Sequence, residues 1–523
     1  MRNIKGLEHL LLGSAAILTA AAGAQAADLP SRKAEPVQYV RICDAYGSGF
    51  FFIPGTDTCL RVGGYVRVNA QYTPSQNVYQ AGDTVSSKGL VTARGGSISQ
   101  IAKDQDETGL QVRGRIDLDA RTQSQWGTVR TFVRMRGENN DGVRATSGQT
   151  NFNTVYNPAG NASSKLTMER MYIQFAGVTA GLMDENYNTA PGPSYFFTSN
   201  FTSGFSNGVK GLRYDAIFGG GWTWENSIES RGDFDFGGTD GKAVLPSTVQ
   251  TSLLDTYNNA WNTGYNWVST LTYEQKWGHV ALSGALGDNS LGHGTIPGTL
   301  VDAGSNNPQS GSVTYGAWAI GPEIDIFFPQ FAPGDEFYAN FSYSVGLLGE
   351  VSGTGFNALT GDSPNRKVLG GVIREDSNFT PTSVDANGNI TGVGQNAGWE
   401  INSSYTHYWT PQWRSNLGVS YLQINPPTAN ANVGAGCYTA IAVGGTEPTT
   451  CAGLNTQWGK GTLFAVQLNL IWSPVKNFDI GIEGEWGEMR NTLQNPNANF
   501  VAAGEPGLNE SNWLTMLRLQ RGF

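Results

Sequence analysis

The chain has 523 residues and a formal net charge of −10, with only 15% charged residues and 69 glycines. Soluble domains carry roughly 25% charged residues and about 7% glycine, so both values are unusual for a soluble globular protein. The net negative charge argues against a nucleic-acid-binding protein, because such proteins need a basic surface.

The first 26 residues have the layout of a secretory signal peptide. Arg2 and Lys5 form a basic region, residues 10–22 form an apolar region, and residues 24–26 (Ala-Gln-Ala) form a small-residue cleavage site. The apolar region is shorter than the roughly 20 residues that a membrane-spanning helix needs. A buried N-terminal helix is the alternative. Cleavage after residue 26 would move the net charge from −10 to −11, and no later apolar run is long enough for a membrane helix. If the mature chain spans a membrane, it must do so as a closed β-barrel.

The next segment, residues 27–58, contains the first of four cysteines. An even number of cysteines in an exported chain favours disulfides, and the partners closest in sequence are Cys43 with Cys59 and Cys437 with Cys451. A metal site is the competing interpretation, but there is no Cys-x-x-Cys spacing to support it. We therefore expect two disulfides and no metal.

Residues 59–523 are expected to form one barrel domain, because two-residue alternation recurs along them. Between residues 110 and 121, Leu110, Val112 and Ile116 occupy one face, whereas Arg113, Arg115 and their polar neighbours occupy the other. Successive side chains of a strand point to opposite faces, so such a segment has one apolar and one polar face.

Sixteen segments show this pattern, the even number that a single-chain bacterial barrel requires. They are residues 60–71, 110–121, 126–137, 165–176, 179–184, 209–218, 221–231, 264–277, 278–287, 313–327, 335–347, 397–409, 413–425, 460–473, 477–489 and 511–523. A soluble all-β protein also alternates and is the alternative. The sequence predicts an all-β fold, a 16-stranded antiparallel transmembrane β-barrel.

The connections between these segments alternate in length. Seven are short turns, several of them flanked by tryptophan, as at Trp126 and Trp277. Eight are long and polar: residues 72–107, 138–164, 185–208, 232–263, 288–312, 348–396, 426–459 and 490–510. Outer-membrane barrels have short periplasmic turns, long extracellular loops and aromatic residues at the membrane interface.

Arginine is abundant on the polar faces of neighbouring predicted strands. The residues concerned are Arg113, Arg115, Arg130, Arg134, Arg136 and Arg170. Guanidinium groups stay charged at physiological pH, so they would form a fixed positive field on the wall of a lumen, partly compensated by Asp117 and Asp119. The alternative is an ordinary solvated sheet face.

The third long connection, residues 185–208, is the candidate for the opposite charge. Asp184 and Glu185 stand at its beginning, and aromatic and turn residues follow. If the loop folds inward against the wall, the lumen narrows to a charged constriction that filters hydrated solutes. The alternative is a surface loop with solvated acids.

The sequence contains no set of residues that would support an enzyme. Residues 204–208 match G-x-S-x-G formally, but Ser206 lies in a glycine- and serine-rich loop and not at a strand-to-helix elbow. We find no EF-hand, P-loop or H-E-x-x-H pattern, and therefore expect no catalytic residues and no cofactor.

The beginning and the end of the mature chain resemble a known family. The stretch from residue 40 to residue 67, VRICDAYGSGFFFIPGTDTCLRVGGYVR, is similar to the opening of the porins of rhizobia, bradyrhizobia and Brucella. The junction at residues 26–30 and the Arg-Gly-Phe end are similar too, and Phe523 ends a final alternating strand as in the signal for barrel assembly. One departure is Leu182-Met183-Asp184-Glu185, where relatives often carry arginine.

The resemblance implies an outer-membrane general porin of a Gram-negative bacterium. It implies a homotrimer of 16-stranded barrels in outer-membrane lipid, inserted by the barrel-assembly machinery. Small hydrophilic solutes and ions would diffuse passively through each barrel, with the third loop constricting it. A substrate-selective channel with a lumen site for sugars or anions is the alternative. An outer-membrane enzyme and a plugged, non-conducting barrel are further alternatives.

Overall fold

The structure is a computed structural model. It describes residues 41–74, 84–85, 91–93, 108–141, 163–187, 208–230, 260–262, 265–291, 313–351, 379–384, 390–425, 427, 457–494 and 509–523. The chain divides into two units, Met1–Ile42 and Cys43–Phe523. Within the described part of the chain, no helix is both long enough and apolar enough to cross a bilayer. The signal peptide predicted for residues 1–26 lies outside the described residues.

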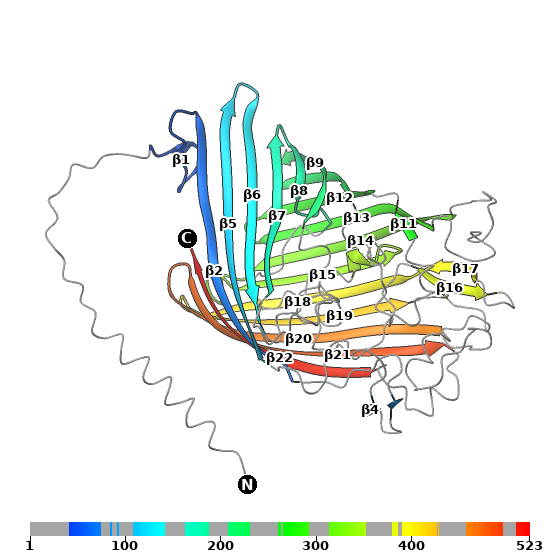
Figure 1. Ribbon diagram of the computed structural model, residues 1–523. Coiled ribbons are helices and arrows are strands. Elements are labelled where there is room, and N and C mark those ends of the chain that lie inside the picture. Colours follow the sequence, from blue (N-terminus) through cyan, green and yellow to red (C-terminus); the bar gives the residue numbers. More distant parts are fainter. Residues whose placement is uncertain are drawn as a thin grey trace, which may run out of the picture. The chain divides into compact units, whose positions relative to one another are not determined.

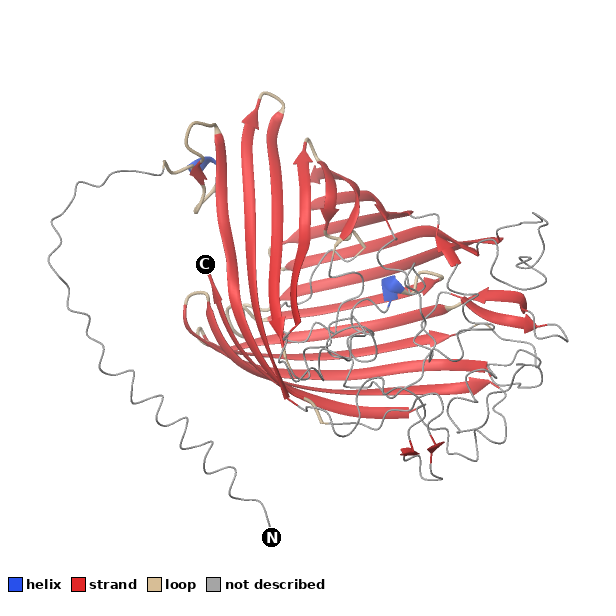
Figure 2. Cartoon of the chain, viewed as in Figure 1, coloured by secondary structure: helices blue, strands red, loops and turns tan. Residues whose placement is uncertain are grey.

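The second unit is dominated by β-strands (Figures 1 and 2). Sixteen long strands follow the chain: β2 (Thr58–Tyr72), β5 (Thr108–Ser124), β6 (Gly127–Asn140), β7 (Ser163–Phe175), β8 (Val178–Met183), β9 (Val209–Gly219), β10 (Trp222–Ser230), β12 (Tyr265–Gln275), β13 (Gly278–Leu291), β14 (Val313–Phe327), β15 (Glu336–Val345), β18 (Ala397–Thr410), β19 (Trp413–Asn425), β20 (Gln457–Val475), β21 (Phe478–Gln494) and β22 (Asn509–Gly522). The remaining strands, none longer than six residues, are β1 (Phe51–Phe52), β3 (Thr84–Val85), β4 (Val91–Ala93), β11 (Ala260–Asn262), β16 (Phe379–Val384) and β17 (Ile390–Gln395).

Each long strand pairs antiparallel with its neighbours in the chain, and the sheet closes on itself. The first long strand β2 pairs with the last, β22, from Tyr65 opposite Gly522 to Tyr72 opposite Thr515 (Figure 1). The terminal Phe523 continues this seam, because its amide donates to the Gly64 carbonyl at 3.1 Å. β1 pairs with the start of β2, and β11 pairs with the far end of β13. The 16-stranded closed antiparallel barrel is therefore confirmed.

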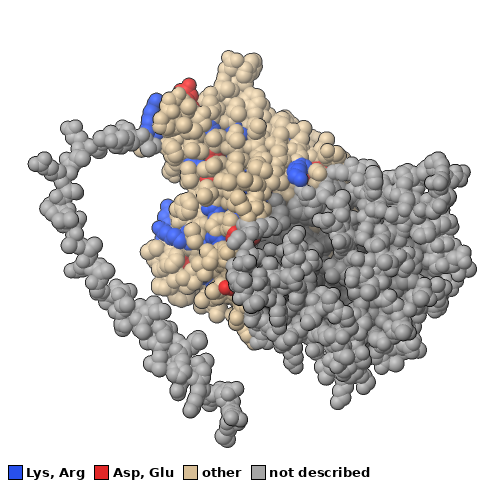
Figure 3. All heavy atoms as spheres, in the orientation of Figure 1, with Lys and Arg blue, Asp and Glu red and all other residues tan. Residues whose placement is uncertain are grey.

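The outer face of the barrel is apolar. On β5, Leu110, Val112 and Ile116 are exposed, whereas Gln111 and Asp119 on the other face are buried. Charged atoms occupy only small parts of the described surface that Figure 3 shows. Such a band of exposed apolar side chains is favourable in contact with lipid and unfavourable in water. A soluble β-sandwich has the opposite arrangement, with its apolar side chains inside and its polar side chains outside.

Aromatic side chains gather at the turn end of the barrel. Trp126 is exposed in the turn between β5 and β6, and Trp409 is exposed at the end of β18. Trp413 and Trp472 stack across β19 and β20 with ring centroids 5.8 Å apart. Amphipathic aromatic rings are favoured at the level of lipid headgroups, so these positions mark one membrane interface.

The longest of the short turns, between β14 and β15, is held by one buried carboxylate. Asp335 accepts hydrogen bonds from the Tyr405 hydroxyl at 2.8 Å, from His407 Nδ1 at 2.8 Å and from the Tyr408 amide at 2.9 Å. Burial alone would raise the pKa of Asp335, but these hydrogen bonds outweigh it and hold the pKa below its usual value. The turn is thereby fixed to the neighbouring strand β18.

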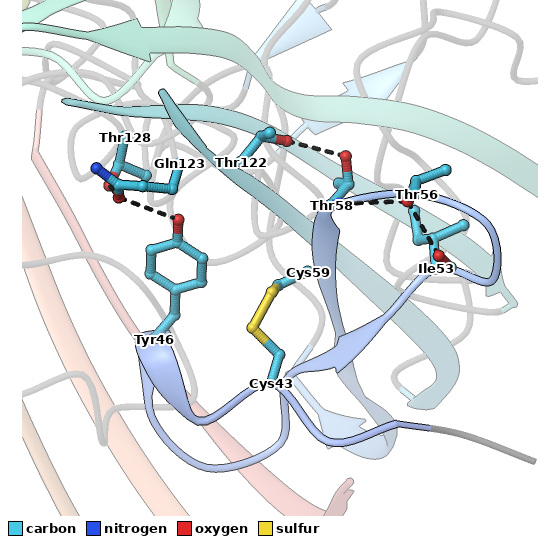
Figure 4. The surroundings of a disulfide bond; sticks show 9 residues. All are labelled: Cys43, Tyr46, Ile53, Thr56, Thr58, Cys59, Thr122, Gln123 and Thr128. Carbon is cyan, nitrogen blue, oxygen red and sulfur yellow. Dashed lines mark hydrogen bonds between the residues drawn. A yellow bond between two sulfur atoms is a disulfide. The ribbon is translucent and has the colours of Figure 1, made fainter. Parts of the chain in front are cut away.

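The segment before the barrel is fixed by a disulfide. Cys43 is bonded to Cys59 at the start of β2 (Figure 4), as the sequence predicted. Phe50 is buried beside this disulfide, and the guanidinium carbons of Arg61 and Arg121 lie 5.2 and 5.0 Å from the centre of its ring. The predicted partners Cys437 and Cys451 lie outside the described residues.

Candidate pore constriction

The arginines predicted on β5 and β6 lie on one face and are interleaved with carboxylates. In the strand register, Arg115 is opposite Arg136, and Asp117 is opposite Arg134. Arg134 Nε donates to Asp117 Oδ1 at 2.9 Å. Since Leu110, Val112 and Ile116 of β5 are exposed on the outer face, the charged side chains on the opposite face of β5 and their partners on β6 face the interior of the barrel.

Other carboxylates pair with arginines on this wall; the sequence indicates Asp119 among them, but not Glu138 or Glu169. Glu138 on β6 is 2.9 Å from Arg113 Nη2, and Asp119 on β5 accepts from Arg130 Nε at 3.0 Å. Glu169 on β7 accepts from Arg136 Nη1 at 2.5 Å. The predicted arginines are thus brought together as a ladder of ion pairs, in which Glu138 and Glu169 add to the compensation that the sequence indicates for Asp117 and Asp119.

Glu169 escaped the sequence analysis because β7 contains a β-bulge. The register between β6 and β7 shifts after Arg134, which is opposite Arg170, whereas Met135 is opposite Met168. A bulge inserts one residue into a strand and breaks the two-residue alternation. The sequence feature that indicates this bulge is the three-residue spacing of Met168 and Met171, because both side chains are exposed on the outer face.

Arg170 joins the two ends of the third long loop. Its Nε donates to Asp184 Oδ1 at 2.5 Å at the beginning of the loop. At the other end, Gly208 has a φ of +83°, and a Cβ atom there would lie 2.5 Å from Arg170 Nη1. Only glycine combines this backbone conformation with such a close approach. The predicted site residues Arg170 and Asp184 therefore form an ion pair at the base of the loop.

The first residues of this loop turn into the barrel. Glu185, Asn186 and Tyr187 are all buried. The Asn186 amide donates to Glu229 Oε1 on β10 at 2.9 Å, and Thr270 Oγ1 on β12 donates to the Asn186 carbonyl at 2.6 Å. Both wall residues are buried, so the segment packs on the inner face of strands that follow β9 in the barrel. The loop residues 188–207, including Ser206, lie outside the described residues.

Tyr187 reaches farthest along the wall. Its hydroxyl lies 2.7 Å from Ser342 Oγ on β15, and its ring is buried among Val268, Ala285, Ala317 and Ala319. Burial raises the pKa of the Tyr187 phenol well above its ordinary value, so the hydroxyl keeps its proton and can donate.

Carboxylates also line the wall that faces the arginines. In the cyclic order of the sixteen strands, β5 and β6 are eight places from β14 and β15. Glu323 on β14 lies 3.1 Å from His279 Nε2 and accepts from the Tyr338 hydroxyl at 3.2 Å. Asp325 lies next to them on the same face of β14, and Glu336 follows at the start of β15. The sequence predicts the negative side in the third loop and not at these wall residues, although alternation over 313–327 indicates their face.

Fold and inner face together define a class: a 16-stranded outer-membrane β-barrel with a charged interior. A family profile described as "Porin subfamily" matches residues 28–506. The chain belongs to this porin family, which confirms the resemblance seen in the sequence, and its location is the outer membrane of a Gram-negative bacterium. The family is one of channel proteins and not of enzymes.

Individual relatives agree with this assignment. The chain is 33% identical to "Porin Omp2b" of Brucella abortus (strain 2308) and 32% identical to that of Brucella canis, in each case over 238 residues. These matches cover 45% of this chain and 56% of either relative. Among solved structures, the outer membrane channel DcaP of Acinetobacter baumannii is similar with a TM-score of 0.52 and 16% identity, covering 90% of this chain and 99% of that one. This likeness concerns the fold.

Proposed function

We propose that the protein forms a water-filled channel through which small hydrophilic solutes and ions diffuse passively. The observation that supports this most directly is the charged inner face of the barrel. The arginines of β5 and β6 lie on this face, eight strands away from the carboxylates Glu323, Asp325 and Glu336 of β14 and β15. A buried apolar core would fill a small barrel with side chains, whereas charged walls are stable only beside water or ion partners.

The constriction of this channel would lie between the two walls. Arg113, Arg115, Arg130, Arg134, Arg136 and Arg170 would contribute its basic side, with Asp184 and Glu185 at the base of the third loop. Opposed charges in a narrow aqueous passage orient dipolar solutes and disfavour apolar ones. Assembly as a homotrimer, cleavage of residues 1–26 and insertion by the barrel-assembly machinery belong to the same proposal.

The test is single-channel recording of the purified protein in a planar lipid bilayer with asymmetric salt. The proposal expects conductance steps in groups of three that rise in proportion to salt, and the reversal potential gives the preferred ion sign. A folded barrel that stays silent in the bilayer would contradict the proposal and would favour a plugged barrel.

A further inference from the structure

We infer that Gly346–Val351, the beginning of the connection after β15, is a second constriction segment that acts together with the third loop. This inference rests on the proposed channel function. The sequence predicts residues 346–347 as the end of a strand and residues 348–351 as the beginning of a long connection. In the structure Leu347, Leu348, Glu350 and Val351 are all at most 2% exposed.

One hydroxyl group joins the two segments. Ser342 Oγ on β15 donates to the Glu350 carbonyl at 2.8 Å and lies 2.7 Å from the Tyr187 hydroxyl. A serine hydroxyl has a single proton, so Tyr187 must be the donor in the second hydrogen bond. The third loop and the segment after β15 therefore depend on the same wall residue for their position.

Apolar contacts fix the segment on both sides. Leu347 packs in the cluster that contains Tyr187, with small side chains of β13 and β14 around it. Leu348 and Val351 pack in another cluster, with Leu422, Ile424, Leu463 and Ala465 of β19 and β20. The segment Gly346–Val351 therefore bridges β13 and β14 on one side and β19 and β20 on the other, along the inner face of the barrel. It occupies space that water would fill in an open barrel.

Two glycines of the wall make room for the two segments. A Cβ atom on Gly321 of β14 would lie 2.9 Å from the Tyr187 hydroxyl oxygen. A Cβ atom on Gly398 of β18 would lie 3.1 Å from Leu348 Cδ2 and 3.4 Å from Val351 Cγ1. Glycine in the interior of a strand weakens it and often marks a site where another part of the chain approaches closely. Its presence at both contacts supports specific packing of the two segments against the wall.

The two segments bring carboxylates and no basic groups into the barrel. Asp184 and Glu185 belong to the third loop, and Glu350 belongs to the segment after β15. Asn266 Nδ2 on β12 lies 3.4 Å from Glu350 Oε1, and Glu400 is buried on the inner face of the neighbouring strand β18. Glu350 therefore adds a carboxylate to this side of the barrel, close to Asn266 of β12.

Two variants test the inference in the full-length protein. The double variant Leu348→Asn/Val351→Asn places polar groups in the apolar cluster and should release the segment, raising single-channel conductance by about 1.5-fold and admitting larger polyethylene glycols. Glu350→Gln keeps the shape and removes the charge, so the cation-to-anion permeability ratio should fall by about 1.5-fold. Gly316→Ala on β14, with nothing within 4 Å of its Cβ, and Glu488→Gln, paired with Arg490 on β21, serve as controls.

The outcomes separate this inference from the proposed function. If the wild-type protein conducts but both test variants match it in conductance, polymer cutoff and reversal potential, the segment does not constrict the channel and the inference is wrong. If the double variant fails to fold, Glu350→Gln decides alone, because it changes no packing. A wild-type protein that does not conduct would overturn the proposed function itself.

Discussion

Each inward-facing arginine of β5 and β6 has a carboxylate within ion-pair distance. Arg113 pairs with Glu138, Arg130 with Asp119, and Arg134 with Asp117. These arginine side chains are 18–25% exposed, so water and ions can still reach them. Pairing holds each planar group in place, and the surplus of arginine leaves this wall positive.

Neutralising two of these arginines should change ion selectivity. Arg134→Gln/Arg136→Gln removes two positive charges but leaves Asp117 and Glu169 in place, so we expect the cation-to-anion permeability ratio to rise roughly twofold. The reversal potential in asymmetric potassium chloride measures this. Arg490→Gln is the control, because that side chain is 66% exposed at the end of β21. An unchanged reversal potential would mean that Arg134 and Arg136 do not line the constriction.

Asp335 makes the stability of one turn dependent on pH. Its pKa is lower in the folded protein than in the unfolded chain. The stabilisation is therefore fully present above the ordinary pKa of aspartate, about 4, and is lost as the pH falls through the lower folded-state value. The unfolding temperature in detergent should fall below that pH more steeply for the wild type than for Asp335→Asn.

At neutral pH, Asp335→Asn should lower the free energy of unfolding by about 1–3 kcal/mol, since donors that now bind a carboxylate lose a charged acceptor. Asp57→Asn, at an exposed position, is the matched control. Identical acid profiles of the wild type and Asp335→Asn would show that this hydrogen-bonded carboxylate contributes nothing to the pH dependence.

At the scale of elements, alternation predicts strands well and contacts between loops poorly. The segment predicted at 413–425 coincides with β19 (Trp413–Asn425), because each strand has one face in lipid and one in the barrel. The register shift in β7 and the packing of Tyr187 on Ser342, 155 residues away, depend on tertiary contacts that no local period encodes. The arginine face could be predicted, but its carboxylate partners on other strands could not all be assigned.

The N-terminal element offers a test that does not depend on the channel. Cys43 and Cys59 are 16 residues apart, and closing a loop of about this length contributes about 3 kcal/mol in the chain-entropy model. Cys43→Ser/Cys59→Ser should therefore make the segment 44–57 sensitive to limited proteolysis while the barrel stays resistant. Protease resistance equal to that of the wild type would show that the aromatic contacts of Phe50 suffice without the disulfide.

In the closed strand order, the arginines of β5 and β6 lie eight strands from the carboxylates of β14 and β15. We expect this separation of charge to produce a transverse field in the interior. No single residue produces this field, and the chain as a whole is acidic, with a net charge of −10. The local arrangement and not the net charge should therefore govern how ions pass. Screening by salt distinguishes such a long-range field from a binding site that contacts its ligand directly.

Ion selectivity should therefore weaken as salt rises, while conductance keeps increasing. The screening length falls from about 10 Å at 0.1 M to about 3 Å at 1 M, so charges across an aqueous passage lose their influence on ions at its centre. Reversal potentials at a fixed concentration ratio, measured at low and high mean salt, should approach the value set by bulk ion mobilities. A conductance that saturates with salt, or a block by one sugar or anion that saturates at low concentration, would instead support a substrate-selective channel with a site in the lumen.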